Sequence, residues 1–406
     1  MPPAKTIRPP TRRQFLKRTA ALAMPVALPG LLSSSLSAAH GKPFRAAIIG
    51  HTGAGNYGHG LDMIFTDRPD MEVVAVADAD AYGRADAATR TGAARAYADY
   101  QEMLNREKPD LVSVAPRWTR QHHAMALAAL HGGAHVFLEK PITRTLAEAD
   151  ELLSVARRAR LKIAVAHQMR LAPNLVFLKQ QLEAGLIGEP LQIRAHGKQD
   201  HRAGGEDLIV LGVHLFDLMR WFAGDPQWCS GRLLQDGRDI TLENARPATE
   251  DIGPVAGDNL LAQFGFPKGV TASFSSRRDY QAVAGPWGME LIGTRGTVRI
   301  LADISPRIFL RRPLEWAGSG STERWVPVEG DPTLDWTAEE KSVARANLRV
   351  VDDWLDAIRT DREPACSGLA GMRALEMAHA VFAAGLARAR VSLPLANRQH
   401  PLAHGD

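Results

Sequence analysis

Cysteine is scarce in this chain of 406 residues, which contains only Cys229 and Cys366. The chain can therefore form no more than one internal disulfide. Such a bond is possible in an oxidising compartment, but nothing in the sequence requires it. Low-complexity segments and internal repeats are also missing. Because 45% of the residues are hydrophobic, we expect an ordered globular protein.

Metal-binding spacings are lacking as well. Neither a paired C-x-x-C motif nor an H-E-x-x-H motif occurs in the chain. Possible ligand types do gather at His122-His123 and among His196, Asp200 and His201, but without the spacing of a metal site. The sequence therefore predicts no metal centre.

Acidic side chains are absent from the first 39 residues, which carry six of the 49 lysines and arginines. Without this segment 43 basic residues stand against 45 acidic ones, so no basic excess is left for a nucleic-acid partner. Residues 11–17, Thr-Arg-Arg-Gln-Phe-Leu-Lys, resemble a twin-arginine export motif, and small residues at 37–39 suit a signal peptidase. We expect residues 1–39 to be a twin-arginine signal peptide and the mature protein to be periplasmic or secreted.

The apolar stretch of this segment is short. It runs from Thr19 to Leu32, is interrupted by Pro25 and Pro29, and falls below the roughly 20 apolar residues that a membrane span needs. A membrane anchor is the alternative to a cleaved signal. After cleavage we expect no membrane attachment. Because the twin-arginine route moves folded proteins, a cofactor can be inserted before export.

The length of the chain suits two domains. We expect a first domain over residues 40–166, a second over residues 167–395 and a tail at 396–406. In the first, strands at 110–115, 134–138 and 162–166 alternate with helices at 122–132 and 145–160, which predicts a doubly wound parallel sheet of the Rossmann type.

A glycine-rich segment follows the first apolar strand, Phe44 to Ile49. Gly53, Gly55 and Gly58 have the G-x-G-x-x-G spacing, and a helix is predicted from about Gly60. Such glycines allow a tight turn and the close approach of a pyrophosphate, which lies at the helix N-terminus. The segment predicts a dinucleotide site, and its cofactor-binding candidates are Gly50, Gly53, Gly55, Asn56 and Tyr57.

An acidic residue ends the next strand. This strand, Met71 to Ala77, leads into Asp78, 25 residues after Gly53. A carboxylate near this position binds the ribose hydroxyls of NAD and disfavours the 2′-phosphate of NADP. The alternative role of Asp78 is to cap the following helix. We predict NAD rather than NADP as the cofactor.

The second half of the chain combines hairpins with helices. Strands at 260–264 and 270–274 flank one glycine-containing turn, and strands at 289–292 and 297–300 flank another. Helical periodicity returns at 348–359 and 371–389. This half therefore reads as an α/β domain.

Several of these features occur together in one family. The glycine loop, Asp78, the segment from Pro116 to His122 and the triplet Glu139-Lys140-Pro141 resemble the Gfo/Idh/MocA oxidoreductases in order and spacing, from about Phe44 to about Leu395. The resemblance implies a Rossmann domain followed by an α/β domain with a large open, mainly antiparallel sheet, one face of which often forms subunit contacts. It adds three residues to the cofactor-binding candidates, namely Pro116, His122 and Glu139.

The resemblance also assigns a place to Lys140. In the family this lysine points toward the nicotinamide and the reacting hydroxyl, and a lysine at the carboxyl end of a parallel strand lies where α/β sheets bind ligands. Pro141 suits a rigid strand end. Lys140 is thus a catalytic and cofactor-binding candidate. The alternative is a surface lysine that pairs with Glu139.

The family's other catalytic element is an aspartate one helical turn before a histidine. His214 matches the histidine and is the second catalytic candidate, but Val210 stands at the aspartate position. Since a carboxylate partner raises the basicity of an imidazole, we expect His214 to lack that support. Asp207 would lie two turns away on one continuous helix and could line the same pocket. Asp217 can reach His214 and is expected to be structural.

Further substrate candidates are Arg170, Asp200 and His201. The family commonly has an arginine near the substrate at the place of Arg170, which could equally form an interdomain salt bridge. Asp200 and His201 belong to a polar cluster that could supply acid–base groups or form a solvated loop. We expect substrate specificity to reside in loops such as Lys198–Glu206 and Gln281–Trp287.

Three functions are compatible with these features. The first is an exported nicotinamide-dependent oxidoreductase that acts on a sugar, polyol or cyclitol and forms a homo-oligomer, a dimer or a tetramer. Because an exported enzyme meets no pool of free NAD, its cofactor should be tightly bound and recycled. The second is a redox-neutral glycosidase that works by oxidation, elimination and reduction. The third is an inactive sugar- or cofactor-binding homologue.

Overall fold

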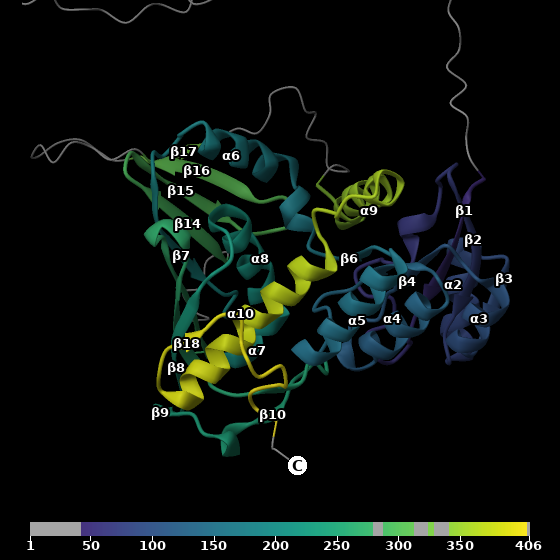
Figure 1. Cartoon of the computed structure of the whole chain (residues 1–406), viewed down its shortest axis with the longest axis horizontal. Helices are drawn as coiled ribbons and strands as arrows, with labels where there is room; N and C mark the ends of the chain where they lie inside the picture. Colours follow the sequence, from purple (N-terminus) through teal and green to yellow (C-terminus); the bar gives the residue numbers. More distant parts are fainter. Residues whose placement is uncertain (1–41, 279–286, 312–323, 329–340, 404–406) are drawn as a thin grey trace, which may run out of the picture. The chain divides into compact units, whose positions relative to one another are not determined.

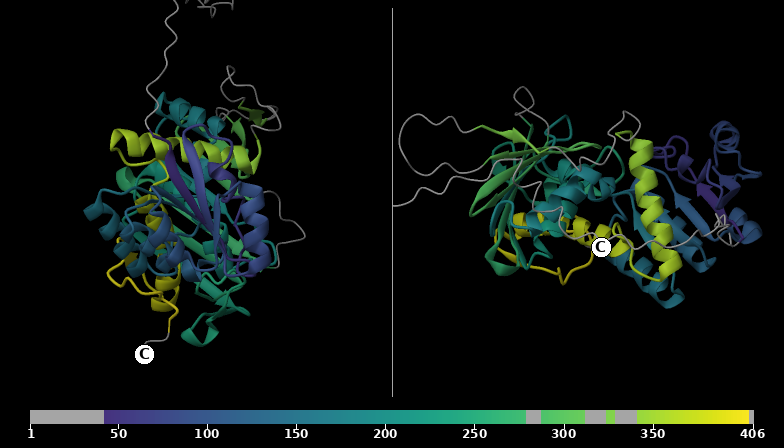
Figure 2. Two further views of the ribbon diagram at one scale, coloured as in Figure 1. Left: turned by 90° about the vertical axis from the view of Figure 1, so that its right-hand side faces the viewer. Right: turned by 90° about the horizontal axis from the view of Figure 1, so that it is seen from above.

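The computed structural model of the chain describes residues 42–278, 287–311, 324–328 and 341–403 (Figure 1). The predicted signal peptide, residues 1–39, lies outside the described residues, as do residues 404–406 of the predicted tail. The described residues form two large sheets with helices packed on them (Figures 1 and 2).

The first sheet is parallel and has six strands in the order β3-β2-β1-β4-β5-β6. The strands are β1 (Phe44–Ile49), β2 (Met71–Ala77), β3 (Arg95–Tyr97), β4 (Leu111–Val114), β5 (His135–Leu138) and β6 (Ile163–Val165). The order reverses between β1 and β4, which is the switch point where Rossmann folds bind a dinucleotide. The predicted doubly wound sheet is confirmed.

Alternate residues of the first sheet enter two different cores. In β1, Ala47 and Ile49 join the core beneath one layer of helices, whereas Ala46 and Ile48 join the core on the opposite face. A strand covered on both faces needs a continuous apolar run, and the sequence of β1 provides one. The helices of this part are α2 (Ala81–Thr91), α3 (Tyr100–Glu107), α4 (His122–His131) and α5 (Leu146–Ala159).

Helix α9 (Val343–Thr360) completes one of these cores, although it comes from near the end of the chain. Its Trp354 is fully buried, with ring centroids 5.8 Å from Phe137 of β5 and 6.4 Å from Phe65. The indole Nε1 donates a hydrogen bond to the carbonyl of Lys162. The first sheet therefore depends on residues far beyond the segment that forms its strands.

The second sheet has ten strands and is mainly antiparallel, with one parallel pair, β13 and β7. Its strands are β7 (Pro190–His196), β8 (Trp228–Gln235), β9 (Arg238–Asp239), β12 (Asn259–Gly265), β13 (Thr271–Arg277), β14 (Gly288–Gly293), β15 (Gly296–Leu301), β16 (Arg307–Arg311), β17 (Val326–Pro327) and β18 (Val391–Ser392). A separate pair joins β10 (Arg246–Pro247) and β11 (Pro254–Val255). Both predicted hairpins, β12–β13 and β14–β15, are confirmed.

One face of this sheet is covered by helices, as Figure 1 shows for α8 (Gly212–Ala223) and α10 (Gly368–Ala387). Phe216 of α8 packs 5.6 Å from Phe264 and 5.0 Å from Phe274, ring centre to ring centre. On β13 every second residue is buried, so the opposite face of the strand carries serines and Arg277. The remaining helices are α6 (Pro173–Glu183) and α7 (Gly205–Val210).

The helix predicted from about Gly60 is not formed. After the glycine loop the chain makes turns and one short 3₁₀ helix, Met63–Phe65. Gly58 and Gly60 have φ angles of +60° and +80°, which a right-handed helix cannot contain. The glycine spacing predicts a helix start at this point, but these two glycines turn the chain instead.

None of the helices in the described residues is long and apolar enough to cross a membrane.

Candidate active site

The glycine loop passes very close to the carboxyl end of β4. Gly53 and Gly55 have φ angles of +87° and +88°, a region that favours glycine. A methyl group at Gly55 would lie 2.5 Å from the backbone nitrogen of Arg117, whereas one at Gly53 would meet nothing within 4 Å. The side chain of Asn56 accepts a hydrogen bond from the Gly53 amide and so holds the turn.

These two glycines give a matched pair of variants. Gly53→Ala should cost only the strain of a positive φ, about 1–2 kcal/mol. Gly55→Ala carries the same strain and also overpacks against backbone, so we expect it to cost about 1–3 kcal/mol more. Urea unfolding of the cofactor-free variants measures both free energies. Equal destabilisation would show that the close approach to Arg117 has no energetic weight.

A hollow of about 310 Å³ opens beside this loop at the switch point of the sheet. Two carboxylates, Asp78 and Asp99, lie among its lining residues, and no lysine or arginine is among them. Asp78 accepts hydrogen bonds from the amide and hydroxyl of Thr52 and from the amide of Asp80. Acidic walls fit the ribose hydroxyls of NAD and repel a 2′-phosphate. The residues present therefore fit NAD.

Three cofactor-binding candidates make contacts within the protein. The ring of Tyr57 fills the space next to Gly50, and its hydroxyl donates to the Gly83 carbonyl at 3.4 Å. His122 is fully buried, with its ring nitrogens 2.7 Å and 2.9 Å from the carbonyl oxygens of Pro116 and Pro141. Tyr57, His122 and the Pro116 carbonyl thus stabilise the loops around the glycine-rich segment. The sequence alone could not show that these side chains point into the protein.

Lys140 follows the carboxyl end of β5 and is 5% exposed. Its Nζ donates a hydrogen bond of 3.1 Å to the backbone carbonyl of Val210. The ion pair with Glu139 that was the alternative is not formed in the described residues, because Glu139 contacts His59 instead. One of the three ammonium hydrogens of Lys140 is thus bonded to the last residue of α7, and the other two have no hydrogen-bond partner among the described residues.

His214 lies beside a second histidine, His167, which is not among the residues predicted for the site. The ring centroids of His214 and His167 are 5.3 Å apart, and Trp287 lies 6.1 Å from His214. The Nδ1 atoms of both histidines are buried without a hydrogen-bond partner among the described residues. Burial lowers the pKa of His214 well below its ordinary value, and the nearby His167 and Lys140 lower it further.

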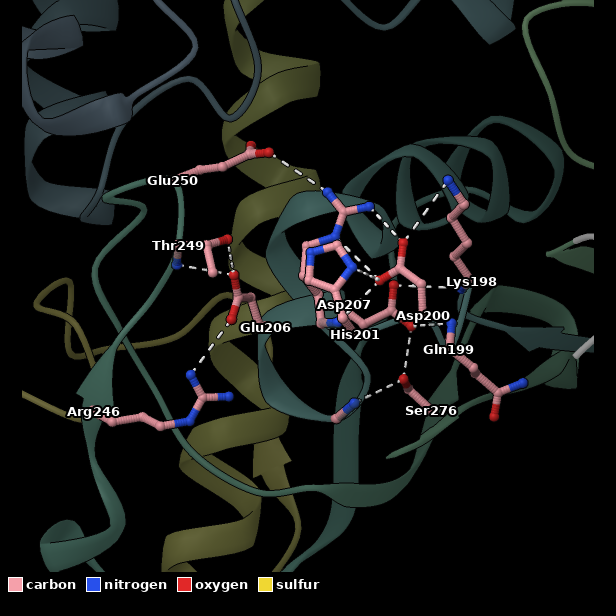
Figure 3. A network of polar contacts seen from close by, with 12 residues as sticks. Lys198, Gln199, Asp200, His201, Glu206, Asp207, Arg246, Thr249, Glu250 and Ser276 are labelled. Atoms are coloured by element: carbon pink, nitrogen blue, oxygen red, sulfur yellow. Dashed lines mark hydrogen bonds and ion pairs between the residues drawn. The ribbon is translucent and has the colours of Figure 1, made fainter. Parts of the chain in front are cut away.

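The predicted helix through Asp207 and His214 is broken. Leu211, with φ of −123°, separates α7 from α8. Asp207 is fully buried and accepts hydrogen bonds from the Ser276 hydroxyl at 2.7 Å and from the Gln199 amide at 3.1 Å (Figure 3). Burial raises its pKa. Asp207 therefore fastens the 197–199 turn to α7 and is wrong as a pocket-lining substrate residue.

The other acidic candidate is also engaged within the protein. Asp200 forms a two-pronged ion pair with Arg202, at 2.6 Å and 3.1 Å. Burial alone would raise the pKa of Asp200, but the hydrogen bonds from Arg202 lower this pKa to about 2. The side chain of His201 is 74% exposed. The alternative of a solvated loop fits these residues better than an acid–base role.

Arg170 forms a salt bridge with Asp217. Its guanidinium binds both carboxylate oxygens of Asp217, at 2.9 Å and 2.5 Å, and also the Asp217 carbonyl. The two side chains are 12% and 2% exposed. Arg170 thus forms the salt-bridge alternative, with Nε and Nη2 bound to α8. Of the predicted specificity loops, residues 281–286 lie outside the described residues.

A chain of amides connects this region to the glycine loop. The Gln168 side chain donates to Asn347 at 2.7 Å, and Asn347 donates to the His59 carbonyl at 2.9 Å. His59 and Asn347 had no motif that singled them out. The sequence does carry a signal for His167, because it lies two residues after β6, at the ligand-binding edge of the sheet. No group of three or more His, Cys, Asp or Glu side chains that could hold a metal occurs in the described residues.

Comparison with known proteins agrees with this geometry. Residues 44–167 match the model of the Gfo/Idh/MocA oxidoreductase family, NAD-binding Rossmann fold. Residues 179–393 match the model of the C-terminal alpha/beta domain of the same family. The chain belongs to the Gfo/Idh/MocA family. It is an oxidoreductase with an NAD-binding domain, as the resemblance implied.

Two of the curated relatives that it resembles are named as sugar or glucoside dehydrogenases. D-apiose dehydrogenase of Paraburkholderia graminis is 25% identical over 84% of this chain and 87% of its own length. D-glucoside 3-dehydrogenase of Escherichia coli is 31% identical over 47% of this chain and 57% of its own length. The solved structure of levoglucosan dehydrogenase with NADH and levoglucosan has a TM-score of 0.71 at 20% identity, covering 87% of this chain and all of that one.

Proposed function

We propose that this protein is an exported, NAD-dependent oxidoreductase that converts a CH–OH group of a sugar, polyol or cyclitol, and that it keeps its cofactor through the catalytic cycle. The observation that carries the proposal is the hydrogen bond from Lys140 to Val210, which begins the segment that contains His214. Lys140 follows a strand of the same sheet that lines the dinucleotide hollow. The names of the relatives support the substrate class.

The chemistry requires a hydride acceptor, which the oxidised nicotinamide supplies when bound. The protein's part is to hold the hydroxyl and to accept its proton. Lys140, fixed by the Val210 carbonyl, has donors left for the reacting oxygen. His214 is partly buried next to it and suits a hydrogen bond to a neighbouring hydroxyl.

Export and cofactor retention belong together in this proposal. The segment 1–39 supports twin-arginine export to the periplasm or beyond. Outside the cytoplasm free NAD is not supplied, so the hydride should return to a second sugar or to the oxidised intermediate within the same site. We also propose a homo-oligomer that uses the open face of the second sheet, where Leu261 of β12 is 52% exposed.

The test is to denature the mature protein after purification from the periplasm and to identify any dinucleotide it releases. We expect NAD or NADH in near-stoichiometric amount, and a change in its absorbance when the native protein meets a suitable sugar. A protein without nicotinamide, or one whose turnover consumes added NAD stoichiometrically, would contradict cofactor retention. Bound cofactor that no sugar reduces would favour an inactive binding protein, for which Val210 is the main support.

A further inference from the structure

His59 is held in place at the exit of the glycine loop. It lies between Gly58 and Gly60, whose positive φ angles turn the chain on either side of it. Its carbonyl accepts a hydrogen bond of 2.9 Å from Asn347, a residue that is 1% exposed. The imidazole itself is 38% exposed. A backbone fixed from α9 thus presents a ring that solvent and ligands can reach.

A buried carboxylate supports this imidazole. Glu139 is fully buried, and its Oε1 lies 2.9 Å from Nδ1 of His59. Burial alone would raise the pKa of Glu139, but the hydrogen bond and charge of His59, together with Lys140, hold it below the usual range. An ionised carboxylate accepts the Nδ1–H of His59. The Nε2 lone pair of that ring is then left to take up a proton.

The two imidazoles of this region therefore differ in chemistry. His214 has Val210 where the family has an aspartate, and its Nδ1 finds no partner among the described residues. Burial, and next the basic groups His167 and Lys140, lower the pKa of His214 and so favour its neutral ring. His59 has the carboxylate that His214 lacks. The pair is tied to the same region as both catalytic candidates. Lys140 follows Glu139 in the chain, and hydrogen bonds through Asn347 connect the His59 backbone to Gln168, the residue after His167, whose ring lies beside His214.

We infer that His59, backed by Glu139, is the acid–base residue of this active site and replaces the carboxylate–histidine pair that Val210 interrupts. The inference rests on the proposed function. When a CH–OH group is oxidised, the carbon loses a hydride to the nicotinamide, and the oxygen loses a proton. The oxygen's proton moves to Nε2 of His59 and from there to water, and the C–O bond becomes a carbonyl. In the reverse direction His59 returns the proton to the oxygen.

The experiment compares two histidine variants of the full chain. His123 forms a similar pair with Glu151, 2.8 Å apart, on α4 and α5, so His123→Ala is the matched control. His59→Ala should lower kcat by about 10²-fold, in the range of a lost acid–base group, with NADH affinity by fluorescence changed less than about threefold. Added imidazole should restore about tenfold of the loss. His123→Ala should change neither quantity.

Two further measurements separate a chemical role from a structural one. Glu139→Gln combined with His59→Ala should be no slower than the slower single variant, because both remove the same unit. In the cofactor-free protein, the NMR signal of an Nδ1–H bonded to a carboxylate should disappear in His59→Ala and persist in His123→Ala.

The outcomes are distinct. Turnover by His59→Ala within threefold of the wild type would overturn this inference and leave the proposed function standing. Retained NADH affinity with no response to imidazole would also overturn it, since a lost proton acceptor should be replaceable. A wild type that oxidises and reduces no sugar would overturn the proposed function, and the inference with it.

Discussion

Replacing Lys140 with alanine is expected to lower kcat for sugar oxidation by about 10²–10⁴-fold, the range of a lost acid–base or polarising group. Lys140 is buried, and one of its donors is fixed by the Val210 carbonyl. No other lysine lies within two residues of it in the chain to take its place. The affinity for NADH should fall much less, because the dinucleotide hollow beside the glycine loop is lined by other residues.

Lys162 provides the control for this variant. It precedes β6 at the amino end of the same sheet, is 11% exposed and pairs with Asp361 at 3.0 Å. It therefore matches Lys140 in charge and near-burial but lies away from the ligand-binding edge. Lys162→Ala should leave kcat within about threefold of the wild type, as expected for a residue with no part in acid–base catalysis. Steady-state rates measure kcat, and fluorescence titration measures the affinity for NADH. A Lys140→Ala enzyme that keeps a tenth of the wild-type activity would refute a catalytic role for Lys140.

Replacing Asp217 with alanine is expected to lower the free energy of unfolding by about 3–5 kcal/mol, because it leaves the Arg170 guanidinium buried without its partner. The pair is bidentate, and Asp217 is nearly inaccessible to solvent. An exposed pair of the same type joins Arg232 to Asp239 at 3.1 Å. Asp239→Ala should cost less than about 1 kcal/mol.

A double variant tests the reason for that loss. If an unpaired buried charge causes it, Arg170→Met with Asp217→Leu should recover most of the stability, since an apolar pair can replace a buried ion pair at little cost. Urea unfolding of the cofactor-free proteins measures the free energy of unfolding of Asp217→Ala, of Asp239→Ala and of the double variant. A double variant as unstable as Asp217→Ala would show that packing between Arg170 and α8, rather than charge, governs the stability.

The sequence predicted the first strands well because residues close together in the chain mark where each strand begins and ends. The bounds of β1 and β2 agree with the prediction residue for residue, since each strand is a short apolar run that ends at a turn or an acidic residue. The helix after the glycine loop was the exception. Its spacing looked like a helix start, but Gly58 and Gly60 supply positive φ angles that end the helical path.

The candidate site was predicted less completely. Lys140 and Asp78 lie at the ligand-binding edge as expected, because the carboxyl ends of parallel strands meet there. Arg170 and Asp207 are substrate candidates in the sequence, and in the structure both bind polar groups of the protein 47 and 69 residues away. Spacing along the chain cannot show such partners.

By itself, the sequence determined the doubly wound sheet, the dinucleotide loop, the preference for NAD and the position of Lys140, because short-range periodicity and turn chemistry encode them. The tertiary structure alone decided which charged groups are already paired within the protein. It also brought Glu139 to His59, 80 residues apart, and α9 onto the first sheet. Those contacts depend on how distant segments pack, since burial and pairing of a charge are properties of its surroundings and not of its neighbours in the chain.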